Sequence, residues 1–234
     1  MSGKTNPKAK ADRAQPTKTK KPMKQTTIKL LAKAVFTGKY PPGTTARDLA
    51  SIKVENRNPG DTALHIAACH GYLPPGTTNT DLLRVRNSDG LTPLHAAAAG
   101  GNLLAGTTVA DLICAKSNTG WTALHMAAAY GNLPLETTVQ DLATTCDNNG
   151  TSAFYAAAFF GHLPAGTTAQ ELRDNVGRCA LEVLAETQVV TVLNNTIASD
   201  EDELHSICGV LMEKYPLETQ EWAQREQNRF AAMN

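Results

Sequence analysis

Four glycines that stand 30 residues apart, Gly60, Gly90, Gly120 and Gly150, open similar segments in this chain of 234 residues. The clearest segment runs from Gly90 to Gly100 and reads Gly-Leu-Thr-Pro-Leu-His-Ala-Ala-Ala-Ala-Gly. A fixed period of about 20–50 residues is typical of chains built from stacked copies of one small unit. The period therefore predicts a solenoid, in which each unit packs mainly against its neighbours.

Each position of the segment has a physical role in a turn that leads into a helix. Glycine after a short polar run supplies the positive φ of a tight turn. The hydroxyls of Thr62, Thr92, Thr122 and Ser152 stand where a helix needs an N-cap. Pro93 occupies the first helical position, where its missing N–H costs nothing. The leucine and paired alanines that follow predict a helix face that packs closely against its neighbours.

A second element recurs in the other half of each unit and reads Leu-Pro-x-Gly-Thr-Thr-x-x-Asp-Leu, as from Leu73 to Leu82. Because proline inside a helix removes a hydrogen bond, the first helix must end before this element. The second threonine and the acid three residues later have the spacing of a capping box. They predict a short second helix of about two turns. Its expected N-caps are Thr45, Thr78, Thr108, Thr138 and Thr168.

The combined motif Gly-x-Thr-Pro-Leu-His-x-Ala-Ala-x-x-Gly resembles the signature of ankyrin repeats, over about residues 27–187. Three copies match it, and the copy from Gly150 has lost the threonine and the histidine. The units are shorter than the roughly 33 residues of the family, because the second helix is abbreviated. The resemblance implies an all-α solenoid of helix-turn-helix units with short second helices, followed by C-terminal helices.

Three regions are expected along the chain. Residues 1–25 form a basic N-terminal arm without enough apolar residues to fold, and residues 26–187 form the solenoid. Residues 188–234 form an acidic helical cap or extension, with a partner-binding role as the alternative. The first expected helix spans Thr27 to Thr37 and places Leu30, Leu31, Ala34 and Val35 on one side. The expected units are an N-terminal cap repeat, repeats near 60–89, 90–119, 120–149 and 150–176, and a C-terminal cap that starts near 177 with Cys179 and Glu182 at the threonine and histidine positions.

The net charge is zero, but the charges are separated along the chain. Residues 1–25 carry eight basic side chains and one acidic side chain, whereas residues 182–234 carry ten acidic and three basic side chains. The resulting charges of +7 and −7 predict weak self-association of the ends, within one chain or between chains. The arm is either a solubilising tail or an electrostatic site for nucleic acid or an acidic partner. Its candidate residues are Lys8, Lys10, Lys18, Lys20, Lys21 and Lys24.

Five cysteines, an odd number without a Cys-x-x-Cys pair, favour free thiols over disulfides or a zinc site. No apolar run reaches the roughly 18 residues of a membrane span, and no signal peptide is evident. We therefore expect a cytoplasmic protein in a reducing compartment, with no membrane association, no metal and no cofactor.

The repeated histidines are candidates for either catalysis or structure. Equivalent positions in successive repeats would place them on a ladder, which favours structure over a shared metal or an acid–base site. The ankyrin resemblance implies that such histidines pack and form hydrogen bonds, so we expect no enzyme. The expected structural residues are Thr62, His65, Thr92, His95, Thr122 and His125.

Variable positions within the repeats supply the candidate binding residues. The resemblance implies that residues beside the turn glycine, and those just before the glycine that closes the first helix, face a concave groove. Large aromatic and aliphatic side chains on such a surface are typical of interface anchors. The alternative is that the C-terminal helices cover some of them. The candidates are His70, Leu91, Trp121, Tyr130, Phe159 and Phe160.

The function predicted from the sequence is a non-catalytic scaffold or adaptor that binds another protein through the concave groove. The alternative is a nucleic-acid- or ribosome-associated adaptor that is anchored by the lysine-rich arm.

Overall fold

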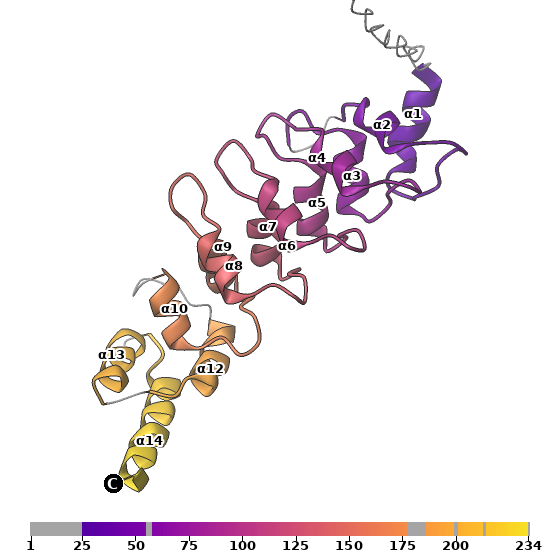
Figure 1. Ribbon diagram of the computed structural model, residues 1–234. Helices are drawn as coiled ribbons and strands as arrows, with labels where there is room; N and C mark the ends of the chain where they lie inside the picture. The colour runs from indigo at the N-terminus through magenta and orange to yellow at the C-terminus, as the bar shows by residue number, and fades with distance from the viewer. Residues whose placement is uncertain (1–24, 55–57, 177–185, 199–200, 213, 234) are drawn as a thin grey trace, which may run out of the picture.

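The computed structural model describes residues 25–54, 58–176, 186–198, 201–212 and 214–233, and regular structure in this part of the chain is helical apart from isolated bridges. The helices stack into an elongated, curved array, which confirms the predicted all-α repeat fold (Figure 1). Their bounds are α1 (Gln25–Ala34), α2 (Ala46–Ala50), α3 (Ala63–Cys69), α4 (Asn79–Leu83), α5 (Pro93–Gly100), α6 (Val109–Cys114), α7 (Ala123–Tyr130), α8 (Val139–Thr144), α9 (Ala153–Phe160), α10 (Ala169–Val176), α12 (Glu186–Asn195), α13 (Glu201–Leu211) and α14 (Pro216–Met233).

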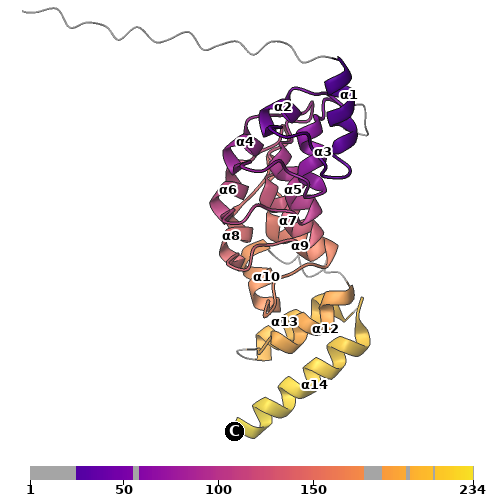
Figure 2. The same ribbon diagram turned by 90° about the vertical axis from the view of Figure 1, so that its right-hand side faces the viewer.

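The array has two layers of helices (Figure 2). The first helices of the repeats, α3, α5, α7 and α9, pack side by side in one layer, and α2, α4, α6 and α8 form the other. Leu64, Leu94, Leu124 and Phe154 at equivalent positions of the first layer are fully buried. The paired alanines beside them are also fully buried, and their small side chains let successive helices approach closely. One continuous core therefore runs through the repeats.

The second helices are short and begin at capping boxes. In α8, the Asp141 N–H donates to Thr138 Oγ1 (3.1 Å) and the Thr138 N–H donates to Asp141 Oδ2 (3.0 Å). Helices as short as α8, with six residues, are marginal alone, so the cap and one fully buried leucine, here Leu142, hold it in place. The same box opens α2, α4 and α6.

The repeat-opening glycines are required by the turns that connect neighbouring units. Gly90 has φ +76° and Gly120 has φ +84°, values that L side chains rarely adopt. The Asn118 N–H donates to the Asp89 carbonyl at 2.9 Å, which joins one turn to the next. A Cβ atom added to Gly90 would lie 2.7 Å from the Asn118 nitrogen, so a side chain there would push the two turns apart.

At the N-terminal end, α1 buries a narrower face than the sequence predicts. Leu31, Ala34 and Val35 are buried, whereas Leu30 is 56% exposed. The expectation for Leu30 is wrong because residues at i, i+3 and i+4 share a helix face, and Leu30 lies one residue out of that pattern.

At the other end, α12 and α14 continue beyond α10 instead of folding back along the repeats (Figures 1 and 2). Thr196 links these elements: its Oγ1 accepts from the Ala169 N–H of α10 (2.7 Å), and its carbonyl accepts from Trp222 Nε1 of α14 (3.0 Å). Pro216 begins α14 at the first helical position, which proline tolerates. Cys179 and Glu182, with the expected start of the C-terminal cap, lie outside the described residues.

Candidate functional site

The repeated histidines join each repeat to the next. The Thr92 N–H donates to His95 Nδ1 at 3.1 Å, so this nitrogen is an acceptor and the ring proton lies on Nε2. His95 Nε2 then donates to the Trp121 carbonyl at 3.1 Å. His65 and His125 form the equivalent pairs with the Leu91 and Thr151 carbonyls, each at 3.0 Å.

The environment of these histidines keeps them neutral. Burial lowers the pKa of His95 to about 4, and it also lowers the pKa values of His65 and His125. Both ring nitrogens already have partners within the protein, so neither is available to take a ligand or move a proton. Within the described ranges, no group of three or more histidine, cysteine or acidic side chains is placed to hold a metal ion.

A hollow of about 720 Å³ lies over α3, α5 and α7 of the first-helix layer. Phe36 and His70 line it at one end, and Met126 and Tyr130 line it at the other. Its floor is mostly apolar, and the polar pair at its edge is internally satisfied because Asn87 Nδ2 donates to Asp61 Oδ1 at 2.9 Å. We call this hollow the concave groove. Its remaining lining residues are Asn58, His65, Ile66, Cys69, Leu91, Thr92, His95, Ala96 and Ala99.

The concave groove is open because Gly100 has no side chain to fill it. His70, Gly100, Tyr130 and Phe160 occupy equivalent, exposed positions in successive repeats. A Cβ atom on Gly100 would lie only 2.0 Å from the Cys69 carbonyl oxygen, so no side chain fits there. The missing side chain leaves the space between His70 and Tyr130 open.

Three of the predicted binding residues, His70, Leu91 and Tyr130, come together in the concave groove. Phe36 was missed by the sequence reasoning, although it lies two residues before Gly38 just as Cys69 lies two before Gly71. The rule for groove positions, applied to the first repeat, would have found it. The Phe36 and His70 rings lie 5.9 Å apart between centroids, and Phe36 is 57% exposed.

The other predicted residues lie outside this hollow. Trp121 is half-buried and stacks on His125 with ring centroids 5.4 Å apart. Phe159 and Phe160 are 54% and 51% exposed and lie edge to face at 5.1 Å. Tyr130, which lines the hollow from the repeat just before that of Phe159 and Phe160, is 59% exposed. The C-terminal helices therefore leave these aromatic side chains open to solvent.

The predicted electrostatic arm cannot be placed, because Lys8, Lys10, Lys18, Lys20, Lys21 and Lys24 lie outside the described residues. Among the helices that are described, none combines the length and the apolar character that crossing a bilayer requires.

Comparison with curated proteins finds no match. The family model for ankyrin repeats (3 copies) matches residues 77–135, which include α5 and α7 with His95, His125 and Tyr130, whereas α3 with His65 lies before the matched range. Ankyrin repeats are generally modules for protein–protein interaction. The repeated turn glycines, the paired helices and this match together show that residues 77–135 are ankyrin repeats.

Proposed function

We propose that this protein is a non-catalytic scaffold that binds a protein partner through the concave groove. The observation that carries the proposal is an open apolar hollow of about 720 Å³, flanked by the half-exposed rings of Phe36 and Tyr130. Concave apolar surfaces with a few fixed polar groups are where proteins usually bind their ligands. Large exposed rings at the rim are the side chains most often found to anchor interfaces.

The lining indicates the chemistry of the partner. Ala96 and Ala99 are small, so the floor admits a bulky side chain without rearrangement. Asp61 and Asn87 already bind one another, which leaves little polar surface to satisfy. The partner therefore presents at least one aliphatic or aromatic side chain, which enters between Phe36 and Tyr130.

The aromatic side chains of Phe159 and Phe160 extend this surface toward the C-terminal repeats. Tyr155 stacks on Phe159 with ring centroids 6.4 Å apart, so these rings form a preordered apolar edge. We infer that the partner lies across several repeats, with its main anchor at Tyr130 and a second contact at Phe159. Trp121 is the weaker candidate because its ring is already stacked on His125.

A pull-down from cell extract, quantified by mass spectrometry, tests the proposal. The wild-type chain is compared with Phe36→Ala/Tyr130→Ala and with Ala99→Lys, which fills the concave groove without removing a contact. Leu135→Ala is the control, because Leu135 is 105% exposed and does not line the concave groove. Partners should be depleted with both groove variants and retained with the control.

The affinity of a recovered partner is then measured with purified proteins. Loss of one well-placed anchor typically costs about 2 kcal/mol or more, which is roughly a thirtyfold weaker affinity. Unchanged affinity in both groove variants would place the binding surface elsewhere and refute the proposal.

A further inference from the structure

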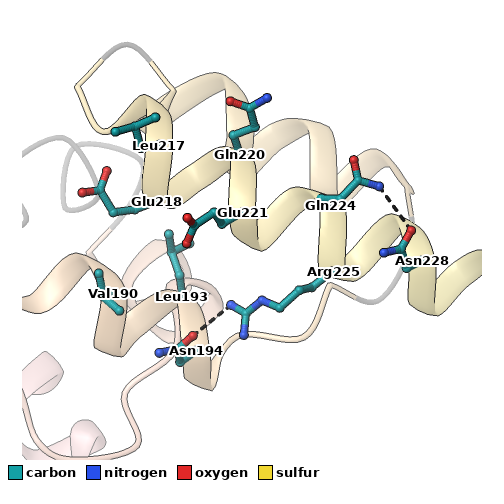
Figure 3. A pocket seen from close by; sticks show the side chains of 10 residues that line it. All are labelled: Val190, Leu193, Asn194, Leu217, Glu218, Gln220, Glu221, Gln224, Arg225 and Asn228. Atoms are coloured by element: carbon teal, nitrogen blue, oxygen red, sulfur yellow. Dashed lines mark hydrogen bonds between the residues drawn. The ribbon is translucent and has the colours of Figure 1, made fainter.

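A second groove, separate from the concave one, lies between α12 and α14 at the C-terminal end of the molecule (Figure 3). Its volume is about 710 Å³, and we call it the C-terminal groove. Leu193 is buried in its floor, whereas Val190 is 51% exposed and Leu217 is 70% exposed. One aliphatic side chain on each wall, Val190 on α12 and Leu217 on α14, is thus left uncovered.

Two glutamates give this groove an acidic rim. Glu218 and Glu221 project from α14 on the side that faces α12 (Figure 3). Arg225 is held by Asn194, whose Oδ1 accepts from Arg225 Nη2 at 2.9 Å. Neither glutamate forms an ion pair with any described side chain. The groove therefore offers apolar surface beside carboxylates that are free to bind a cation.

The chain itself contains a segment of complementary chemistry. Residues 18–24 read Lys-Thr-Lys-Lys-Pro-Met-Lys, with four lysines and the single apolar side chain of Met23. Methionine is flexible and adapts to irregular apolar surfaces. Lysine ammonium groups would pair with the carboxylates of Glu218 and Glu221. Both parts of the C-terminal groove are matched by this short stretch.

The number of residues between this segment and α1 decides whether the segment can reach the C-terminal groove of its own molecule. Lys24 directly precedes α1, and α1 and α14 lie at opposite ends of the molecule (Figures 1 and 2). Seven residues extend at most about 25 Å. Packed helices are about 8–10 Å apart. The distance from α1 to the C-terminal groove, which includes the row from α3 through α9 and the elements beyond it, is therefore greater than the roughly 25 Å that seven residues can span. The segment cannot enter the groove of its own chain.

We propose that the C-terminal groove binds residues 18–24 of a second copy of this protein, so that the copies associate head to tail. Because donor and acceptor surfaces lie at opposite ends, each added copy leaves one of each exposed, and the association continues as an open chain. The contact relies on solvent-exposed charges, so salt weakens it. This association is independent of partner binding in the concave groove.

Sedimentation equilibrium of the full chain is the first measurement. At low ionic strength the weight-average mass should rise continuously with protein concentration, and at high salt it should return to the monomer value. A mass that equals the monomer at every concentration in low salt overturns the proposal.

A charge exchange identifies the two surfaces. One variant carries Glu218→Lys and Glu221→Lys, and the other carries Lys18→Glu, Lys20→Glu, Lys21→Glu and Lys24→Glu. Each variant alone places like charges on the segment and the groove, so its self-association should weaken about tenfold or more, which corresponds to about 1.4 kcal/mol. A mixture of the two restores opposite charges and should associate again.

A matched control separates this contact from a general effect of charge. Asp89→Lys/Glu136→Lys changes the net charge as much as the groove variant does, at exposed positions away from the C-terminal groove. It should associate like the wild-type protein. If the control also abolishes association, or if the mixture stays monomeric, the proposed contact is wrong. Circular dichroism of each variant verifies that the helices are intact.

Discussion

Single buried histidines carry the connection between repeats, and they do so in the neutral state. His95 accepts a hydrogen bond at Nδ1 and donates one at Nε2, so a second ring proton would displace the Thr92 N–H. The side chain is 1% exposed, and burial disfavours the charged form. Protonation of the ladder therefore disrupts the N-terminal cap of each first helix, whereas the Nε2–H that bonds to the next repeat is retained.

This arrangement predicts an acid-sensitive fold. An exposed histidine in the unfolded chain binds its proton near pH 6.5, whereas folded His95 binds it only near pH 4. The unfolded state binds more protons between these values, so stability is highest above pH 6.5 and falls as the pH drops toward 4. His95 alone contributes about 3 kcal/mol to this loss. Urea titrations at pH 7.5, 6 and 5 measure it.

The matched variant is His95→Gln, because glutamine at this position can also accept from the cap N–H. It should be less stable than wild type at pH 7.5 and show a shallower decline toward pH 5. An equal decline in both proteins would assign the acid sensitivity to other groups. The capping aspartates such as Asp141 also have lowered pKa values, because of their hydrogen bonds to threonine, but their contribution disappears only below about pH 4.

Glu136 stands where the other repeats have a glycine. The equivalent glycines Gly43, Gly76, Gly106 and Gly166 all have φ between +78° and +86°. The turn at Glu136 is closed by the same hydrogen bond, from the Thr137 N–H to the Pro134 carbonyl at 3.0 Å. The Thr137 hydroxyl is buried there without a hydrogen-bond partner among the described residues, whereas the Thr77 hydroxyl donates to the Pro74 carbonyl.

We therefore predict that Glu136→Gly stabilises the protein. The equivalent glycines adopt a positive φ, at which a side chain costs about 1 kcal/mol, so the change should raise the melting temperature by about 2–4 °C in a chain of this size. Differential scanning calorimetry checks the shift. The converse change, Gly106→Glu, should lower the melting temperature by a similar amount, and a decrease with Glu136→Gly would contradict the prediction.

Among the elements, the second helices show how much local sequence can specify. The spacing of threonine and acid predicts their N-termini, because a capping box involves only residues three apart. The structure places the boxes of α2, α4, α6 and α8 at those positions. The C-terminal helices have no such repeat. Trp222 bonds to Thr196, 26 residues away, and no spacing rule predicts that pair.

The caps of these short helices should be unusually important for stability. Thr138→Ala removes the hydroxyl that accepts from the Asp141 N–H at 3.1 Å. The expected loss is about 1 kcal/mol, since a helix of six residues has few other backbone bonds to sustain it. Thr138→Ser keeps the hydroxyl and should lose much less. Chemical denaturation of the two variants measures the difference, and equal losses would mean that the methyl group, not the cap, is important.

The concave groove was predictable only in part, because it depends on contacts between repeats. The resemblance to ankyrin repeats implies that His70, Leu91 and Tyr130 lie on one face, because they occupy the groove positions of that family's motif. It does not show that Gly100 lies against the Cys69 carbonyl, which leaves a hollow rather than a flat surface. Trp121 was expected among the groove residues, but it does not line this hollow and stacks on His125.

At the scale of the whole molecule, each helix contacts mainly the helices next to it in the array. Each first helix packs on the next, and the C-terminal helices contact the solenoid mainly through α10 and α12. Stability in such an array is approximately a sum of unit and interface terms. A defect near one end is therefore expected to open that end without unfolding the centre.

Trp222→Ala tests this locality. Trp222 is 1% exposed and bonded to the Thr196 carbonyl, so the variant loses about 3–5 kcal/mol of packing at the C-terminal end. Hydrogen exchange followed by mass spectrometry should show faster exchange in peptides from α12 to α14. Peptides from α5 and α7 should keep wild-type protection, because their neighbours are unaltered. Leu124→Ala, which removes a fully buried side chain from the central repeat, is the comparison and should speed exchange there. Equal loss of protection along the whole chain in the Trp222 variant would show that the molecule unfolds as a single cooperative unit.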